Sequence, residues 1–174
     1  MAGFTHLARR FVGSLRPGGP SATDTAWAES QLLPDEIPLW RSMSRADRRH
    51  AAGVARRVEV ALGSEATRPV LAAALLHDVG KTESGLGTYG RVIATISGAV
   101  IGRDPDVVRA WTRTRGFTRG VGLYLQHPRV GGDLLAMAGS DPLTEAWARE
   151  HHLPEEQWTI APEIGAALKA ADDD

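Results

Sequence analysis

Cysteine is missing from this chain of 174 residues, and lysine is almost missing. Without cysteine there is no disulfide and no thiolate ligand, so any bound metal ion must be held by nitrogen and oxygen atoms. Of the 20 basic residues only Lys81 and Lys169 are lysines, and the abundance of arginine indicates a bias of composition rather than a function. Lys81 is of interest because it stands three residues after Asp78.

The sequence also lacks a run of about 18 apolar residues such as a membrane helix needs. Its N-terminus lacks an apolar signal core with a cleavage site, so we expect a cytoplasmic protein without a transmembrane segment. A net charge of −1 argues against a stable nucleic-acid partner. A local basic stretch comprises Arg113, Arg115, Arg119 and Arg129. It is either a solvated surface or an electrostatic funnel for a polyphosphate or nucleotide.

Apolar residues recur at helical spacing along the chain, and no segment alternates apolar and polar residues as a strand does. This pattern predicts an all-α fold. Residues 1–20 are expected to form an amphipathic helix and a Pro/Gly linker, and residues 21–174 a single domain. The helix either packs on its own domain or lies on a membrane surface. Its apolar face comprises Phe4, Leu7, Ala8, Phe11, Val12 and Leu15.

Capping residues and prolines mark the remaining helices. Ser44 and Asp47 resemble a capping box and predict a helix from there to about Leu62. The residue before Pro128 disfavours helical backbone, so His127 is expected at a junction between two helices. The other predicted helices cover 25–33, 69–76, 89–101 (buried), 105–113, 119–126, 142–152 and 162–171.

The pair His77-Asp78 follows the apolar segment 71–76 and is the most informative feature of the chain. An ionised carboxylate at the end of an apolar helix is costly to bury without a cation or a metal ion. Side chains that can complete a metal site recur along the sequence on or beside predicted helix ends. They are His50, His127, His151, His152 and Asp172.

Together His50, His77-Asp78 and Asp172 resemble the H…HD…D pattern of the HD superfamily of metal-dependent phosphohydrolases, over residues 40–174. The most specific part is Leu75-Leu-His-Asp-Val-Gly-Lys81. The run His127-Pro-Arg-Val-Gly131 and the pair His151-His152 are similar to the HPxxG and HH elements of the HD-GYP subgroup. No GYP segment follows His152, which argues against cyclic di-GMP as substrate.

The resemblance implies an HD-domain helical bundle with two divalent transition metal ions, drawn from Fe, Mn, Co, Ni and Zn. His50, His77, Asp78 and Asp172 would hold the first ion. His127, His151 and His152 would hold the second ion, with Asp78 shared. The expected function is a phosphohydrolase or phosphodiesterase acting on a phosphorylated small molecule such as a nucleotide, with Asp78 and Lys81 as catalytic residues.

Lys81, Arg129 and Arg91 are expected to bind the substrate phosphate. The alternative is a catalytically silent HD domain that binds a metal ion or a nucleotide as a sensory or scaffold module. Two assignments stay open within the site. Asp173 rather than Asp172 could be the last ligand, and His151-His152 could be a polar helix end.

Overall fold

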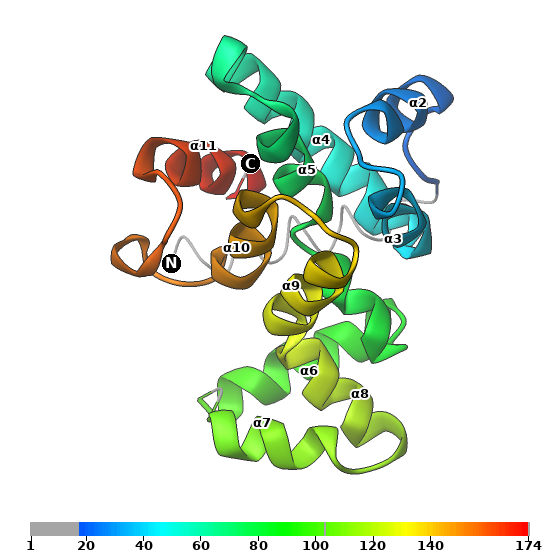
Figure 1. The fold of residues 1–174 in the computed structure, drawn as a ribbon. Helices are drawn as coiled ribbons and strands as arrows, with labels where there is room; N and C mark the ends of the chain where they lie inside the picture. The colour runs from blue at the N-terminus through cyan, green and yellow to red at the C-terminus, as the bar shows by residue number, and fades with distance from the viewer. Residues whose placement is uncertain (1–17, 103, 174) are drawn as a thin grey trace.

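The computed structural model describes residues 18–102 and 104–173, and the regular structure of these residues is entirely helical (Figure 1). This confirms the predicted all-α class. The predicted N-terminal helix lies outside the described residues. The α-helices are α2 (Ala22–Ser30), α3 (Glu36–Ser42), α4 (Arg45–Leu62), α5 (Arg68–Leu76), α6 (Thr88–Val100), α7 (Pro105–Thr112), α8 (Gly116–Leu125), α9 (His127–Met137), α10 (Pro142–Glu150) and α11 (Pro162–Asp173). Short 3₁₀ helices are η1 (Gly63–Glu65), η2 (Val79–Ser84) and η3 (Glu155–Gln157).

Most helices begin where the capping signals predict. The Ser44 hydroxyl accepts a hydrogen bond from the Asp47 amide and caps α4, as expected for the capping box. The prolines at 105, 128, 142 and 162 each stand in the first turn of a helix, where a missing amide hydrogen costs nothing. The junction at His127 is confirmed, because α8 ends at Leu125 and α9 begins at His127.

Two predictions from the sequence were wrong. Helix α3 was not expected. It contains Pro38, which lies in its first turn and is tolerated there. Helix α6 was expected to be buried, but only one face of it is covered. Its apolar residues Tyr89, Ile93, Ile96 and Val100 are at least half exposed.

Helix α5 is the centre of the fold, since every residue from Val70 to Leu76 is buried. Helices α3, α4 and α10 pack around it, and α11 packs on α4 (Figure 1). A helix that is apolar on all sides must be enclosed in this way. The hydrophobic core includes Trp40 of α3, Leu135 of α9, Trp147 of α10 and Leu168 of α11.

Helices α6, α7 and α8 form a separate lobe, residues 88–125, below the main body in Figure 1. Helix α8 packs on α6, on α7 and on η2, so the lobe joins the body beside the segment that follows His77-Asp78. None of its residues belongs to the main core. Its buried apolar side chains, among the described residues, are Ala94, Val108 and Val121.

The first turn of α9 lies directly against η2 because both contain glycine at the point of contact. A Cβ on Gly80 would stand 2.1 Å from the His127 carbonyl oxygen and 2.5 Å from the Gly131 amide nitrogen, which no real side chain can do. The segments 77–81 and 127–131 therefore meet through their glycines. This contact brings His127 beside Asp78.

Candidate metal centre

Five helices and their ends deliver the seven expected ligands to one region of the molecule. His50 lies in α4 and Asp172 in the last turn of α11, while His77 and Asp78 follow α5. His127 opens α9, and the pair His151-His152 follows α10. All of these except His50 and His152 are buried. The expected ligands thus lie far apart in sequence and together in space.

The first group of candidate ligands surrounds Asp172 and His77. The Nε2 atom of His50 lies 2.8 Å from Oδ1 of Asp172, and the Nε2 atom of His77 lies 3.5 Å from the same oxygen. His77 Nε2 is also 3.4 Å from Oδ2 of Asp78. Ligand atoms of His50, His77 and Asp78 all lie within 4.8 Å of one another, which is close enough to hold a metal ion.

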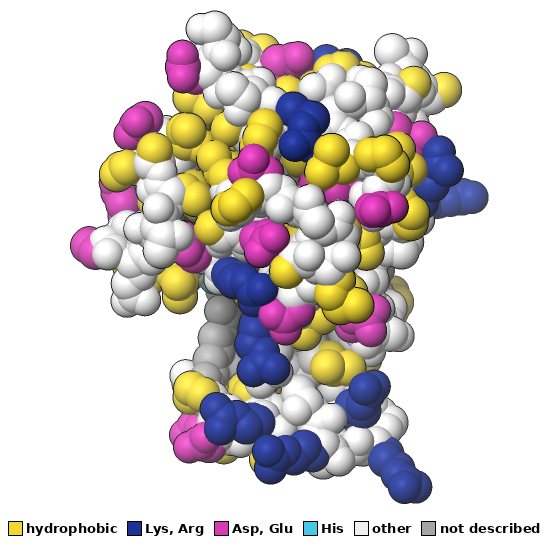
Figure 2. Space-filling view, viewed as in Figure 1, with side chains coloured by type: hydrophobic (Ala, Val, Ile, Leu, Met, Phe, Trp, Pro, Cys, Tyr) yellow, Lys and Arg dark blue, Asp and Glu magenta, His cyan; other side chains and the backbone are white. Residues whose placement is uncertain are grey.

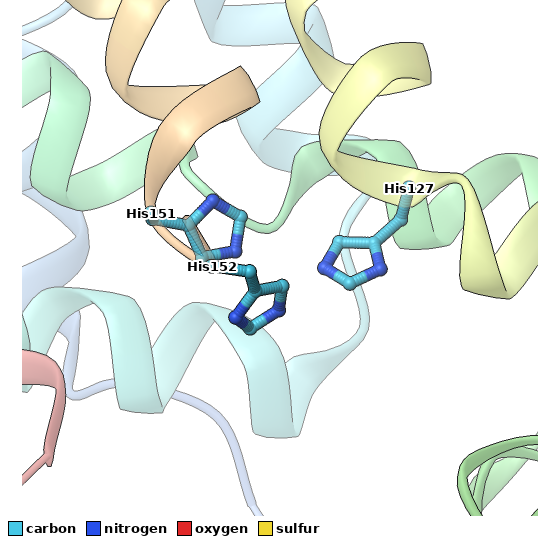
Figure 3. A group of neighbouring side chains, drawn as sticks. All are labelled: His127, His151 and His152. Atoms are coloured by element: carbon cyan, nitrogen blue, oxygen red, sulfur yellow. The ribbon is translucent and has the colours of Figure 1, made fainter. Parts of the chain in front are cut away.

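The second group consists of His127, His151 and His152, whose rings face one another across a short gap (Figure 3). One ligand nitrogen from each lies within 4.8 Å of the others. The ring centroids of His127 and His152 are 5.2 Å apart, and those of His151 and His152 are 4.0 Å apart. Both residues of the pair at the end of α10 therefore belong to a histidine cluster, in which His151 is buried and His152 is exposed.

Asp78 lies between the two groups and faces both. Its Oδ2 atom faces His77, whereas its Oδ1 atom lies 3.3 Å from Nε2 of His127 and 3.7 Å from Nε2 of His151. A carboxylate with one oxygen toward each of two ligand groups has the position of a bridging ligand. The Asp78 carboxylate therefore lies within 3.3 to 3.7 Å of imidazole nitrogens of both groups.

Three of the imidazoles are oriented with Nδ1 toward a backbone carbonyl, which leaves Nε2 directed at the candidate metal site. The Nδ1 atoms of His77, His127 and His151 lie 2.9, 2.7 and 3.0 Å from the carbonyl oxygen of the residue three positions earlier. A carbonyl only accepts hydrogen bonds, so each Nδ1 carries the proton and donates it. Each buried Nε2 has no hydrogen-bond partner among the described residues. Metal-ligating histidines are commonly fixed in this way by a backbone carbonyl.

The charges of the cluster shift the pKa values of its members strongly. Burial alone would lower the pKa of His77, but the carboxylates of Asp78 and Asp172 outweigh it and raise the pKa to about 10. Burial lowers the pKa values of His127 and, more strongly, His151. Burial alone would raise the pKa of Asp78. The pKa nevertheless lies well below its usual range, because Lys81 and His77 stabilise the carboxylate.

The structure distinguishes Asp172 from its neighbour. Asp172 is buried beside His50 and His77, whereas the Asp173 carboxylate lies 3.2 Å from the Lys169 ammonium at the surface. Arg57 of α4 donates two hydrogen bonds, of 3.0 and 2.7 Å, to the carbonyl of Ala171. Sequence reasoning missed Arg57, because a contact across 114 residues leaves no local pattern.

The loop that follows His151-His152 is fastened to α10 by Glu150. Its carboxylate accepts hydrogen bonds from the amide and the hydroxyl of Thr159, at 2.7 and 2.6 Å. Trp158 packs edge-on against Trp147 and on Gly165, so its ring supports the core. Glu150 was not identified from the sequence, although it directly precedes the histidine pair.

The three residues expected to bind phosphate differ in their positions. The Lys81 ammonium contacts Oδ2 of Asp78 inside the site. Arg91 pairs with Asp47 of α4 at 2.6 Å and donates a hydrogen bond to the Leu86 carbonyl. Arg129 is exposed, with its Nε atom 3.9 Å from Asp133. Lys81 is thus the one of the three that the described residues place against the candidate ligands.

The described residues therefore form an all-helical protein with two adjoining His/Asp groups that can hold metal ions. No known protein family, no curated protein and no solved structure matches this chain. No helix among the described residues is long and apolar enough to cross a membrane.

Proposed function

We propose that this protein is a metal-dependent phosphohydrolase or phosphodiesterase of the HD type, acting on a nucleotide-like phosphate ester. The observation that carries the proposal is the convergence of three buried imidazoles, each with its Nδ1–H fixed by a backbone carbonyl, on the single carboxylate of Asp78. The buried Nε2 atoms of these imidazoles have no hydrogen-bond partner among the described residues, which is costly, and a metal ion would remove that cost.

The donor set suits two divalent transition metal ions. His50, His77 and Asp172 would hold one ion, and His127, His151 and His152 the other, with Asp78 between them. Nitrogen and carboxylate ligands without thiolate are compatible with Fe, Mn, Co, Ni and Zn. When bound, such a pair of ions supplies a water molecule of lowered pKa and a clamp for phosphate oxygens.

The protein's own residues would prepare this chemistry. The carbonyls of Ala74, Tyr124 and Ala148 fix the imidazole tautomers. Lys81 keeps the Asp78 carboxylate ionised, as its lowered pKa indicates, and its ammonium stands at the cluster where it can neutralise a substrate phosphate. No side-chain nucleophile is required, because water is the attacking group in this class of reaction.

Element analysis of the purified protein tests the metal centre directly. We expect about two equivalents of transition metal per chain for a binuclear site. Asp172→Asn should lower that content, whereas the matched variant Asp173→Asn, which changes the neighbouring exposed carboxylate, should leave it unchanged. Equal metal content in both variants would exclude Asp172 as a ligand.

A turnover assay tests the activity. The protein is incubated with a generic phosphodiester and a panel of nucleotides in the presence of Fe, Mn, Co or Ni, and product release is measured. His77→Ala and Asp78→Ala should abolish turnover, and His6→Ala, which removes a histidine outside every motif, should not. Two bound metal ions without product from any substrate would instead support the alternative of a silent metal-binding module.

A further inference from the structure

The lobe formed by α6, α7 and α8 exposes an apolar stripe that no described element covers. The α6 stripe consists of Tyr89, Ile93, Ile96 and Val100, which are 76, 50, 59 and 80% exposed. These residues follow the spacing i, i+4, i+7, i+11, so they form one line about 16 Å long on a straight helix. The buried residue Ala94 lies on the opposite face.

The stripe continues onto α8 through Phe117. The Phe117 ring is 51% exposed, and its Cε2 atom lies 3.5 Å from the position of a Cβ on Gly90 of α6. Of the eight large hydrophobic side chains that are exposed among the described residues, five belong to the stripe and Phe117. Such a concentration in one small lobe indicates a surface that binds a partner.

The same lobe carries a strong positive charge. Residues 88–125 contain six arginines and two acidic residues, which leaves 14 basic and 19 acidic residues in the rest of the chain. Four of these arginines are exposed, namely Arg109, Arg113, Arg115 and Arg119. In Figure 2, Lys and Arg side chains gather over the lower part of the molecule. Figure 2 also shows acidic side chains concentrated over the upper body. The lobe that carries the apolar stripe therefore has a net positive charge, whereas the rest of the chain has a net negative charge.

We infer that the α6 stripe and the exposed arginines of the same lobe bind the surface of an anionic lipid bilayer. Exposed aromatic and aliphatic side chains insert at the boundary between headgroups and acyl chains, and arginines of the same lobe attract the anionic headgroups. A nucleic acid would pair with the arginines but presents little apolar surface for contact with Ile93, Ile96 and Val100. A second copy of this chain would cover the stripe only by bringing two positive lobes together.

Vesicle sedimentation with the full chain tests this inference. We expect binding to vesicles of phosphatidylcholine with phosphatidylserine, weaker binding to phosphatidylcholine alone, and a decline with rising salt. Ile96→Asp should weaken binding at least tenfold, and the double variant Arg115→Gln/Arg119→Gln roughly fivefold for each arginine removed. The matched control is Val60→Asp, which changes an 85% exposed apolar residue of α4 outside the lobe.

A second readout reports contact with the bilayer itself. Ile96→Trp should show a blue shift of tryptophan fluorescence when anionic vesicles are added, relative to the unsubstituted protein, whereas Val60→Trp should not. Several outcomes would overturn the inference. The first is equal vesicle binding by Ile96→Asp and Val60→Asp, and the second is a loss of vesicle binding in Phe11→Asp alone. The third is a protein that binds no vesicles but forms a dimer, seen in sedimentation equilibrium, which Ile96→Asp dissociates. The fourth is a protein that binds an oligonucleotide tightly but binds no vesicles.

Discussion

Replacing Gly80 with alanine should uncouple the two halves of the metal centre. The new Cβ would stand 2.1 Å from the His127 carbonyl oxygen, and real Cβ atoms do not approach heavy atoms closer than 3.0 Å. The first turn of α9 must therefore move by about 1 Å relative to η2. Ligand distances in metal sites tolerate only about 0.2 Å, so His127 would no longer be placed for a metal ion shared with Asp78.

The energetic cost follows from the same contact. Both atoms nearest to the added methyl group belong to the backbone of α9, so no side chain can rotate away. Inserting a methyl group into such a contact costs about 1–3 kcal/mol. For a chain of this length that corresponds to a decrease in Tm of roughly 2–4 °C per kcal/mol.

Two measurements on Gly80→Ala test this reasoning. Element analysis should show a decrease from two equivalents of metal toward one, and thermal unfolding should show the lower Tm. Gly87→Ala is the matched control, because a Cβ at Gly87 meets nothing within 4 Å and its φ of −71° suits any residue. A Gly80→Ala variant with unchanged metal content and Tm would refute the argument that the glycines bring His127 to Asp78.

Three further predictions concern the charges and contacts of the site. Arg57→Met removes both hydrogen bonds to the Ala171 carbonyl, so chelator competition should show weaker metal binding, with partial recovery in Arg57→Lys. In the metal-free protein, the pKa values of His127 and His151 are lower in the folded state than in the unfolded state. As the pH drops below about 6.5, the unfolded chain therefore binds more protons than the folded chain, and Tm should fall. The pKa of about 10 for His77 means that the folded state keeps a proton that the unfolded chain has lost, so Tm should also fall between pH 6.5 and 10, and His77→Gln should flatten this alkaline decline. A Tm that is constant from pH 5 to 9 would show that these histidines do not titrate differently on folding.

The amino-acid sequence by itself determined the helical class and most helix boundaries, because periodicity, caps and prolines act over a few residues. It predicted the capped start of α4 at Ser44 and the junction at His127. It did not predict α3, since a proline in a first turn and a proline that ends a helix look the same in one sequence. The exposure of α6 was also missed, because the apolar composition of a helix does not show which of its faces other elements cover.

Only the tertiary structure decided how the candidate ligands combine. The sequence predicted seven ligands, but Asp172 and Asp173 could not be separated until the helix rotation turned one inward and the other toward Lys169. The contact between Gly80 and Gly131 is likewise invisible in the sequence. These features depend on packing between distant segments, whereas the choice of histidine and aspartate at helix ends is local chemistry. The sequence therefore determined which atoms are available to bind a metal, and the fold decided which of them lie within reach of Asp78.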